Sequence, residues 1–141
     1  MTLRAVKPHH ETQLRILDAA EELFMQHGFE GTSMRQLTAK AQANLAAVNY
    51  HFGSKDALIE AVFRRRLDPM NAGRIAELDR LEKDAGGKAL SPQQIIGAFV
   101  GASLRMIEDA KNGGRNFIRL LGRTYSDPQK PIRVQIGRAH V

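Results

Sequence analysis

The sequence predicts an all-α protein, and three observations support that prediction. Along most of the chain, apolar residues recur at the three- or four-residue spacing of one helix face. No segment has the alternation of apolar and polar residues that marks a half-buried strand, and no internal repeat is present. Residues that cap helices stand between the apolar stretches.

Three helices are predicted in the N-terminal part of the chain. The first covers residues 11–27 and ends at Gly28, which can adopt the left-handed conformation of a helix C-terminus. Thr32 and Ser33 are good N-cap candidates for a second, short helix. Asn44 is the next candidate cap and would open a third helix over residues 45–51.

Three longer helices are predicted after these. The fourth begins at Ser54, and Pro69 is expected to bend or interrupt it. Residues 84–90 are rich in Gly and Lys and predict a loop. The fifth helix begins at Ser91-Pro92-Gln93-Gln94, which combines an N-cap, a proline in the first turn and a capping box. The sixth ends at Asp127-Pro128.

The composition limits the class of function. The chain has 21 Lys and Arg against 15 Asp and Glu, a net charge of +6 that suits an anionic partner without choosing between nucleic acid and a membrane surface. It has no cysteine, which excludes thiolate nucleophiles and cysteine-ligated zinc. It also lacks an apolar signal segment or membrane span. We therefore expect a cytoplasmic protein with no membrane partner.

The second and third predicted helices have the arrangement of a helix-turn-helix, whose second helix enters the major groove of DNA. The segment Asn44-Leu45-Ala46-Ala47 gives that helix a tip of low relief, so that its backbone can approach base edges. Asn49 can then reach bases or backbone. Tyr50, His51 and Lys55 supply donors for phosphate groups.

Three separated segments resemble the N-terminal signature of TetR-family repressors, namely Gly28-Phe29, residues 32–37 and residues 50–58. The resemblance covers about the first sixty-five residues. It implies a small core of Phe24, Leu37, Val48 and Phe52. The resemblance and the predicted helix-turn-helix together predict the following DNA-binding residues: Thr32, Met34, Arg35, Asn44, Leu45, Ala46, Ala47, Asn49, Tyr50, His51 and Lys55.

The chain departs from the family pattern at two places. The family usually has Gly-Val in the turn, where this chain has Gln42-Ala43, so the turn is expected to be less tightly built. It usually has an aromatic residue where this chain has Asn49, so the base preference at that position should differ.

A narrower resemblance concerns the ligand. Residues 44–52, Ala61-Val62-Phe63 and residues 117–122 look like PsrA-type members, which respond to long-chain fatty acids or their acyl-CoA forms. This implies a small apolar effector, although an ordinary core would have the same composition. The predicted pocket residues are Phe99, Ser103, Phe117 and Leu121.

Several other clusters have simpler interpretations. Arg64-Arg65-Arg66 is expected to be a solvated helix face rather than a second phosphate contact. His9-His10 is expected to be a frayed terminus rather than a metal site. Met70 and the stripe over residues 95–107 are expected to pack in a core. The pairs Glu21-Glu22 and Glu108-Asp109 should point apart, and no cofactor site or catalytic cluster is expected.

The last six residues fit none of the predicted helices. Their sequence, IGRAHV, matches one reading frame of a common sequencing adapter, so we expect a non-native tail after Gln135. The full-length protein would then continue into dimerisation helices. The expected organisation is a flexible N-terminus (1–10), a helix-turn-helix DNA-binding domain (11–57), a partial helical regulatory domain (58–135) and a non-native tail (136–141).

These features together predict a non-enzymatic regulator, a repressor that binds a double-stranded DNA operator and is released by the effector. It would act as a homodimer when full length. Two alternatives stay open, a basic helical module that binds nucleic acid nonspecifically and a fragment of a helical enzyme. Substitution of Asn49 or Arg35 distinguishes the first alternative, because it relaxes sequence preference only in a specific reader.

Overall fold

The computed structural model describes residues 8–109 and 113–126, and this part of the chain forms six helices and no strand. The all-α prediction is therefore confirmed. The helices are α1 (Pro8–His27), α2 (Met34–Ala41), α3 (Leu45–Phe52), α4 (Lys55–Ala85), α5 (Pro92–Glu108) and α6 (Gly114–Ser126). No helix in these ranges has the length and apolar character needed to cross a membrane.

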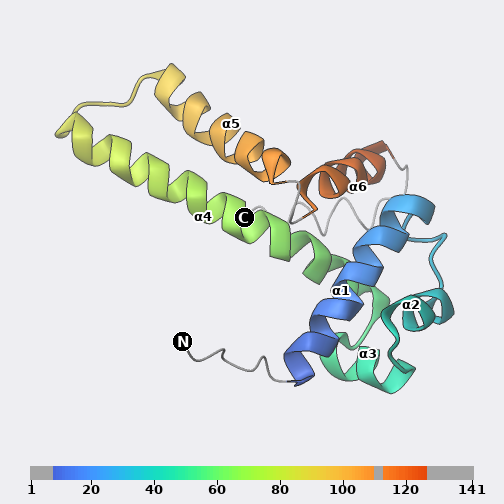
Figure 1. The fold of residues 1–141 in the computed structure, drawn as a ribbon. Coiled ribbons are helices and arrows are strands. Elements are labelled where there is room, and N and C mark those ends of the chain that lie inside the picture. Colours follow the sequence, from blue (N-terminus) through green and yellow to red (C-terminus); the bar gives the residue numbers. More distant parts are fainter. Residues whose placement is uncertain (1–7, 110–112, 127–141) are drawn as a thin grey trace.

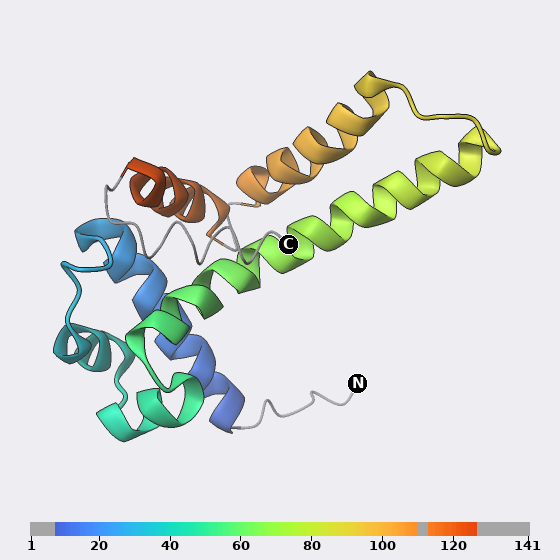
Figure 2. The same ribbon diagram turned by 180° about the vertical axis from the view of Figure 1, so that it is seen from behind.

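The helices form a compact head and a long arm (Figure 1). In the head, α1 packs against α2, α3, the beginning of α4 and α6. The arm consists of α4, which leads away from the head, and α5, which returns beside it in the opposite direction. The view from behind shows the same arrangement, with α6 returning to α1 (Figure 2).

The predicted caps are confirmed where the structure describes them. Ser33 and Ser91 each form a capping box, with Gln36 and Gln94 at the third helical position. The Asn44 side chain accepts a hydrogen bond from the Ala47 N–H at 2.7 Å. Each cap satisfies backbone donors that the first helical turn would otherwise leave without a partner.

Two helix bounds differ from the predictions. The first helix begins at Pro8 rather than Glu11, so His9 and His10 are helical and not part of a frayed terminus. Proline suits the first helical position because its missing N–H is not needed there, and the Thr12 hydroxyl donates to the Pro8 carbonyl at 3.1 Å. Pro69 does not interrupt α4, which continues to Ala85.

The core of the head contains the residues that the family resemblance implied. Phe24, Leu37 and Val48 are fully buried, and Phe52 packs partly buried against them. The same core continues into the arm and α6, where the rings of Phe63 and Phe117 meet edge to face at 5.5 Å. One apolar core thus holds the head to the base of the arm.

The packing prediction for the stripe on α5 is wrong for most of its side chains. The small residues Ala98 and Ala102 are the buried ones, and Met70 of α4 is buried as expected. The large side chains are 42–61% exposed: Ile95, Ile96, Phe99, Val100 and Leu104. An apolar stripe shows that a helix has a face to cover, but it does not identify the element that covers it.

The turn between α2 and α3 contains the only non-glycine residue with positive φ in the described part of the chain. Gln42 has φ 51° and ψ 44°, the left-handed conformation, and its N–H points to the carbonyls of Ala39 and Thr38. Ala43 N donates to the Thr38 carbonyl at 3.1 Å, which closes the turn. A side chain costs about 1 kcal/mol in this conformation, so the turn has a backbone cost that glycine would avoid, whereas its looser construction stays a prediction.

Gln42→Gly is expected to raise the free energy of unfolding by about 1 kcal/mol, because glycine adopts the left-handed conformation without the Cβ clash. Urea unfolding followed by circular dichroism measures the change. Gln42→Ala is the matched control, since it removes the amide but keeps Cβ, and it should give no gain. A loss of stability in Gln42→Gly would mean that the added freedom of the unfolded chain dominates.

Candidate nucleic-acid interface

The entry into α2 is fixed by close backbone packing. A Cβ on Gly31 would overlap the carbonyl oxygen of His27, so this position requires glycine. The Thr32 hydroxyl donates to the Gly28 carbonyl at 2.8 Å, and the side chain is only 2% exposed. Thr32, one of the predicted DNA-binding residues, therefore supports this turn from inside and does not present its side chain on the surface.

Helix α3 has one buried and one exposed side. Val48 is 0% exposed and anchors the helix to the core. On the other side Tyr50 is 77% exposed, and Ala46 and Asn49 are also exposed. A short helix held by one apolar residue and open on its far side has the form of a groove-reading helix.

The predicted tip residues lie together at the start of α3. Leu45 is half exposed and Ala47 is partly buried. Asn44 uses its Oδ1 atom as the helix cap, which fixes the side chain and leaves the amide N–H groups to point elsewhere. The tip is therefore a rigid surface of low relief.

The aromatic side chains at the end of α3 form a cluster with α1. The rings of Tyr50 and His51 meet edge to face at 5.1 Å, and the His9 ring lies 6.3 Å from Tyr50 and 6.5 Å from His51. The cluster brings the first turn of α1 beside the exposed side of α3. His9 was missed as a candidate for this surface because the sequence separates it from Tyr50 by about forty residues.

Lys55 and the α2 residues complete the predicted set. The Lys55 ammonium group sits 4.4 Å from the centre of the Phe29 ring, a cation–π contact that holds it at the start of α4 next to the end of α3. Arg35 is exposed on α2, whereas Met34 is partly buried against the core. Of the predicted residues, Thr32 is buried, and the other ten are exposed or partly exposed in the segment from α2 to the start of α4.

The four predicted pocket residues do not meet in one cavity. Phe117 is fully buried in the core, and Leu121 packs partly buried against that core. Phe99 is exposed beneath the Arg74 guanidinium, which lies 4.6 Å from the ring centre, and Arg74 also donates to the Ser103 hydroxyl at 2.9 Å. The prediction that these side chains share a pocket is wrong for the described structure, because α5 turns Phe99 outward.

A different hollow lies between α4 and α5, with a volume of about 460 Å³. Apolar atoms of Pro69, Met70, Ala102 and Met106 contribute to its walls, together with Gly73. Charged side chains complete the lining: Arg65, Arg66, Arg105 and Asp109. The hollow therefore combines an apolar floor with guanidinium groups.

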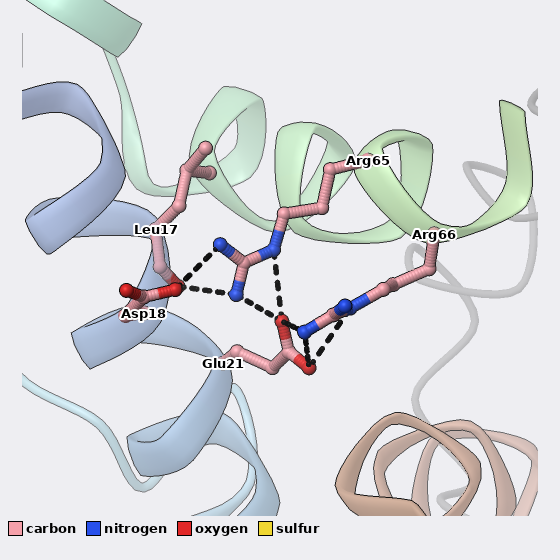
Figure 3. Close-up of polar contacts among 5 residues, drawn as sticks. All are labelled: Leu17, Asp18, Glu21, Arg65 and Arg66. Atoms are coloured by element: carbon pink, nitrogen blue, oxygen red, sulfur yellow. Dashed lines mark hydrogen bonds and ion pairs between the residues drawn. The ribbon is translucent and has the colours of Figure 1, made fainter. Parts of the chain in front are cut away.

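The arginine run on α4 is not uniformly solvated. Arg64 is exposed and pairs with Glu60 at 2.9 Å, as expected for a helix face. Arg65 and Arg66 instead turn toward α1 and pair with the buried carboxylate of Glu21 (Figure 3). The prediction of a solvated face is wrong for these two residues. In the described ranges, no three His, Asp or Glu side chains are grouped to hold a metal ion.

Two family models match the chain. The model described as "Bacterial regulatory proteins, tetR family" matches residues 16–62, from α1 to the beginning of α4. The model described as "Tetracyclin repressor-like, C-terminal domain" matches residues 97–140. The second match extends into the predicted non-native tail, which lies outside the described residues, so the origin of that tail stays a prediction.

Curated relatives match part of the chain. The probable HTH-type transcriptional regulator YttP of Bacillus subtilis is 41% identical over 49 residues, 35% of this chain and 24% of that protein. The HTH-type transcriptional regulator SrpR of Pseudomonas putida is 33% identical over 70 residues, 50% of this chain and 33% of that protein. UidR of Escherichia coli K12, also an HTH-type transcriptional regulator, is 39% identical over 51 residues, 36% of this chain and 26% of that protein.

The matched segments cover a third or less of these three relatives' own lengths. The first family model covers most of α1, all of α2 and α3 and the beginning of α4, which carry the candidate interface, and the second covers most of α5 and all of α6. The predicted family resemblance is confirmed, and this family of regulators agrees with the expectation of a non-enzymatic protein. With one family model on the head and the other on the C-terminal helices, the chain belongs to the TetR family.

Proposed function

We propose that this chain is a DNA-binding transcriptional regulator that reads an operator with α3. The observation that carries the proposal is the construction of α3, which is anchored through Val48 and keeps Asn49 and Tyr50 exposed. The similarity to YttP, SrpR and UidR, described as probable or known HTH-type transcriptional regulators, supports the same function. The protein would work in the cytoplasm, as a homodimer that binds two half-sites.

The exposed residues of the head divide into two roles in this proposal. Arg35 and Asn49 read base edges, since guanidinium and carboxamide groups can form paired hydrogen bonds with guanine and adenine. Tyr50, His51 and Lys55 contact phosphates and set the register on the duplex. The cap at Asn44 keeps the tip of α3 rigid, so these contacts are made without further ordering.

The regulatory step in this proposal is release from the operator when an effector occupies the hollow between α4 and α5. The apolar part of its lining suits the chain of a small apolar ligand, and the arginines of the same lining suit a carboxylate at the end of such a ligand. A long-chain fatty acid or its acyl-CoA form would fit this description. Release requires only that the ligand favour one arrangement of the protein by a few kcal/mol.

Asn49→Ala is expected to flatten the sequence preference of the protein at one or two base pairs, because the carboxamide would no longer discriminate among base edges. The measurement is selection of duplexes from a random pool, followed by binding titrations against single-base variants of the winner. A discrimination loss of about 1–3 kcal/mol at those positions supports the proposal. A uniform loss across all duplexes, or no preference in the unaltered protein, would instead indicate a nonspecific binder.

Lys55→Ala is expected to make the salt dependence of DNA binding shallower, with the slope of log K against log salt falling by about 0.9 for one lost phosphate contact. Lys83→Ala is the matched control, because it removes the same charge from the exposed last turn of the same helix. It should leave the slope unchanged. Equal slopes for Lys55→Ala and the unaltered protein would remove Lys55 from the interface.

Gly73→Leu is expected to prevent binding of dodecanoate, the probe for an apolar carboxylate, by filling the hollow. A Cβ at Gly73 meets no atom within 4 Å, so the larger side chain can be accommodated in the unliganded protein. Gly97→Leu is the matched control, because its Cβ is equally free and the residue does not line the hollow. Isothermal titration calorimetry measures both. Equal affinity in both variants would place the effector elsewhere.

A further inference from the structure

Glu21 is the only buried charged residue in the described part of the chain, with 3% of its surface exposed. It lies on the inner face of α1, and two arginines from α4 approach it (Figure 3). Arg65 donates to its Oε2 atom through Nε at 2.9 Å and also through Nη2. Arg66 donates to Oε1 from Nη2 at 3.1 Å. One carboxylate therefore binds two consecutive arginines.

Further contacts fix Arg65 to α1. Its Nη1 atom donates to the Asp18 carboxylate at 2.7 Å, and Nη2 lies 3.5 Å from the Leu17 carbonyl oxygen. Removing one partner of a buried ion pair leaves the other charge without compensation, which is costly. The cluster of Glu21, Arg65 and Arg66 thus ties the first helix of the head to the arm through directional contacts as well as apolar packing.

Arg66 also meets the segment that joins α5 to α6. A Cβ on Gly113 would lie 2.7 Å from Arg66 Nη2 and 3.7 Å from Glu21 Oε1. The backbone at Gly113 therefore lies directly against the Arg66–Glu21 pair. Three parts of the chain meet at Arg66: α1, α4 and the residue before α6.

The cluster is also accessible from the hollow between α4 and α5. Arg65 and Arg66 line that hollow, and they also line a second one that includes Asp18, Glu21 and Asn116. A molecule in the first hollow would touch the same guanidinium groups that hold Glu21. A change in the direction of these guanidinium groups would therefore alter their contacts with Glu21 on α1.

Helix α4 has a weak point next to the cluster. Pro69 has no N–H and cannot donate to the carbonyl of Arg65, one helical turn earlier. The part of α4 beyond Pro69 can therefore change its direction more readily than an uninterrupted hydrogen-bond ladder would allow. The part before Pro69 is held by Glu21.

We propose that the cluster of Glu21, Arg65 and Arg66 is the joint that sets the orientation of the head relative to the arm. Arg66 is a positioning residue: it is not among the predicted DNA-binding residues, but it transmits changes at the α4–α5 hollow and at Gly113 to α1. The link to an effector rests on the function proposed above for the hollow. The joint itself does not depend on that function.

The joint is tested by the distance between head and arm in the whole chain. Because the chain has no cysteine, Ala39→Cys in α2 and Glu82→Cys in α4, both at exposed positions, introduce a unique pair for spin labels. Pulsed electron spin resonance then gives the distance distribution without DNA or effector. In this background Arg66→Gln is expected to shift and broaden the distribution, and Arg66→Lys to restore it in part, since lysine keeps the charge but not the forked geometry.

Matched variants separate this effect from general destabilisation. Arg64→Gln removes an exposed arginine whose pair is with Glu60, and it should leave the distribution unchanged. Gly113→Ala pushes on Arg66 while keeping every charge, and it should shift the distribution. Gly86→Ala imposes similar strain, since Gly86 also has positive φ, but a Cβ there meets nothing within 4 Å. It should cause no shift. Circular dichroism checks that each variant is folded. If Arg66→Gln is not folded, the result for Gly113→Ala decides the test.

An unchanged distribution in folded Arg66→Gln, or in Gly113→Ala when Arg66→Gln does not fold, would overturn the joint. So would equal shifts in the Arg64→Gln or Gly86→Ala controls. Neither result would contradict the proposed function, which is tested separately by duplex selection. Conversely, a shifted distribution in a protein that lacks sequence preference would retain the joint and overturn the function.

Discussion

The structure depends on one helix, α1, which has to form compatible contacts with four neighbouring helices at once. It packs against α2, α3, α4 and α6. Its apolar side chains, including Ile16, Ala20 and Phe24, are buried with little or no exposure. The same helix buries the carboxylate of Glu21, which needs hydrogen-bond donors and finds them in the guanidinium groups of Arg65 and Arg66. The position of the head relative to the arm is therefore fixed by apolar packing around α1 and by one set of directional ion pairs.

The arm depends on the head in a different way. Its base shares the core of the head through Phe63 and Phe117, whereas its outer part is formed only by α4 and α5. There the two helices approach through small residues such as Ala98 and Ala102, and the larger side chains of α5 remain exposed. Stability should consequently decrease from the head toward the far end of the arm, because local stability follows buried apolar contact.

Local features of the fold were predictable from the sequence. The caps at Ser33, Asn44 and Ser91, the glycine stop at Gly28 and the apolar spacing each act within one helical turn, so a single sequence reveals them. The turn at Gln42 was recognised as a departure, and its left-handed backbone supplies the physical reason. The exposed face of α3 followed from the same short-range pattern.

Features that depend on distant parts of the chain were not predictable. Arg65 and Glu21 are 44 residues apart, and nothing in the run of three arginines indicates that two of them turn inward. Likewise, Phe99 and Phe117 are both phenylalanines on apolar helix faces, yet one is exposed and the other is in the core. Periodicity identifies an apolar face, but the tertiary arrangement decides what covers it.

The length of α4 gives the joint a mechanical consequence. From Arg65 to Ala85 the helix continues for about 30 Å, at about 1.5 Å per residue. A rotation of about 4° at the level of Glu21 would move the far end of such a lever by about 2 Å. The same geometry works in reverse: a small displacement applied far along the arm produces only a slight rotation of the head. For the same displacement, a movement close to the joint therefore rotates the head more than a movement at the far end of the arm. Side chains that act close to the joint have the greater influence on the orientation of α3.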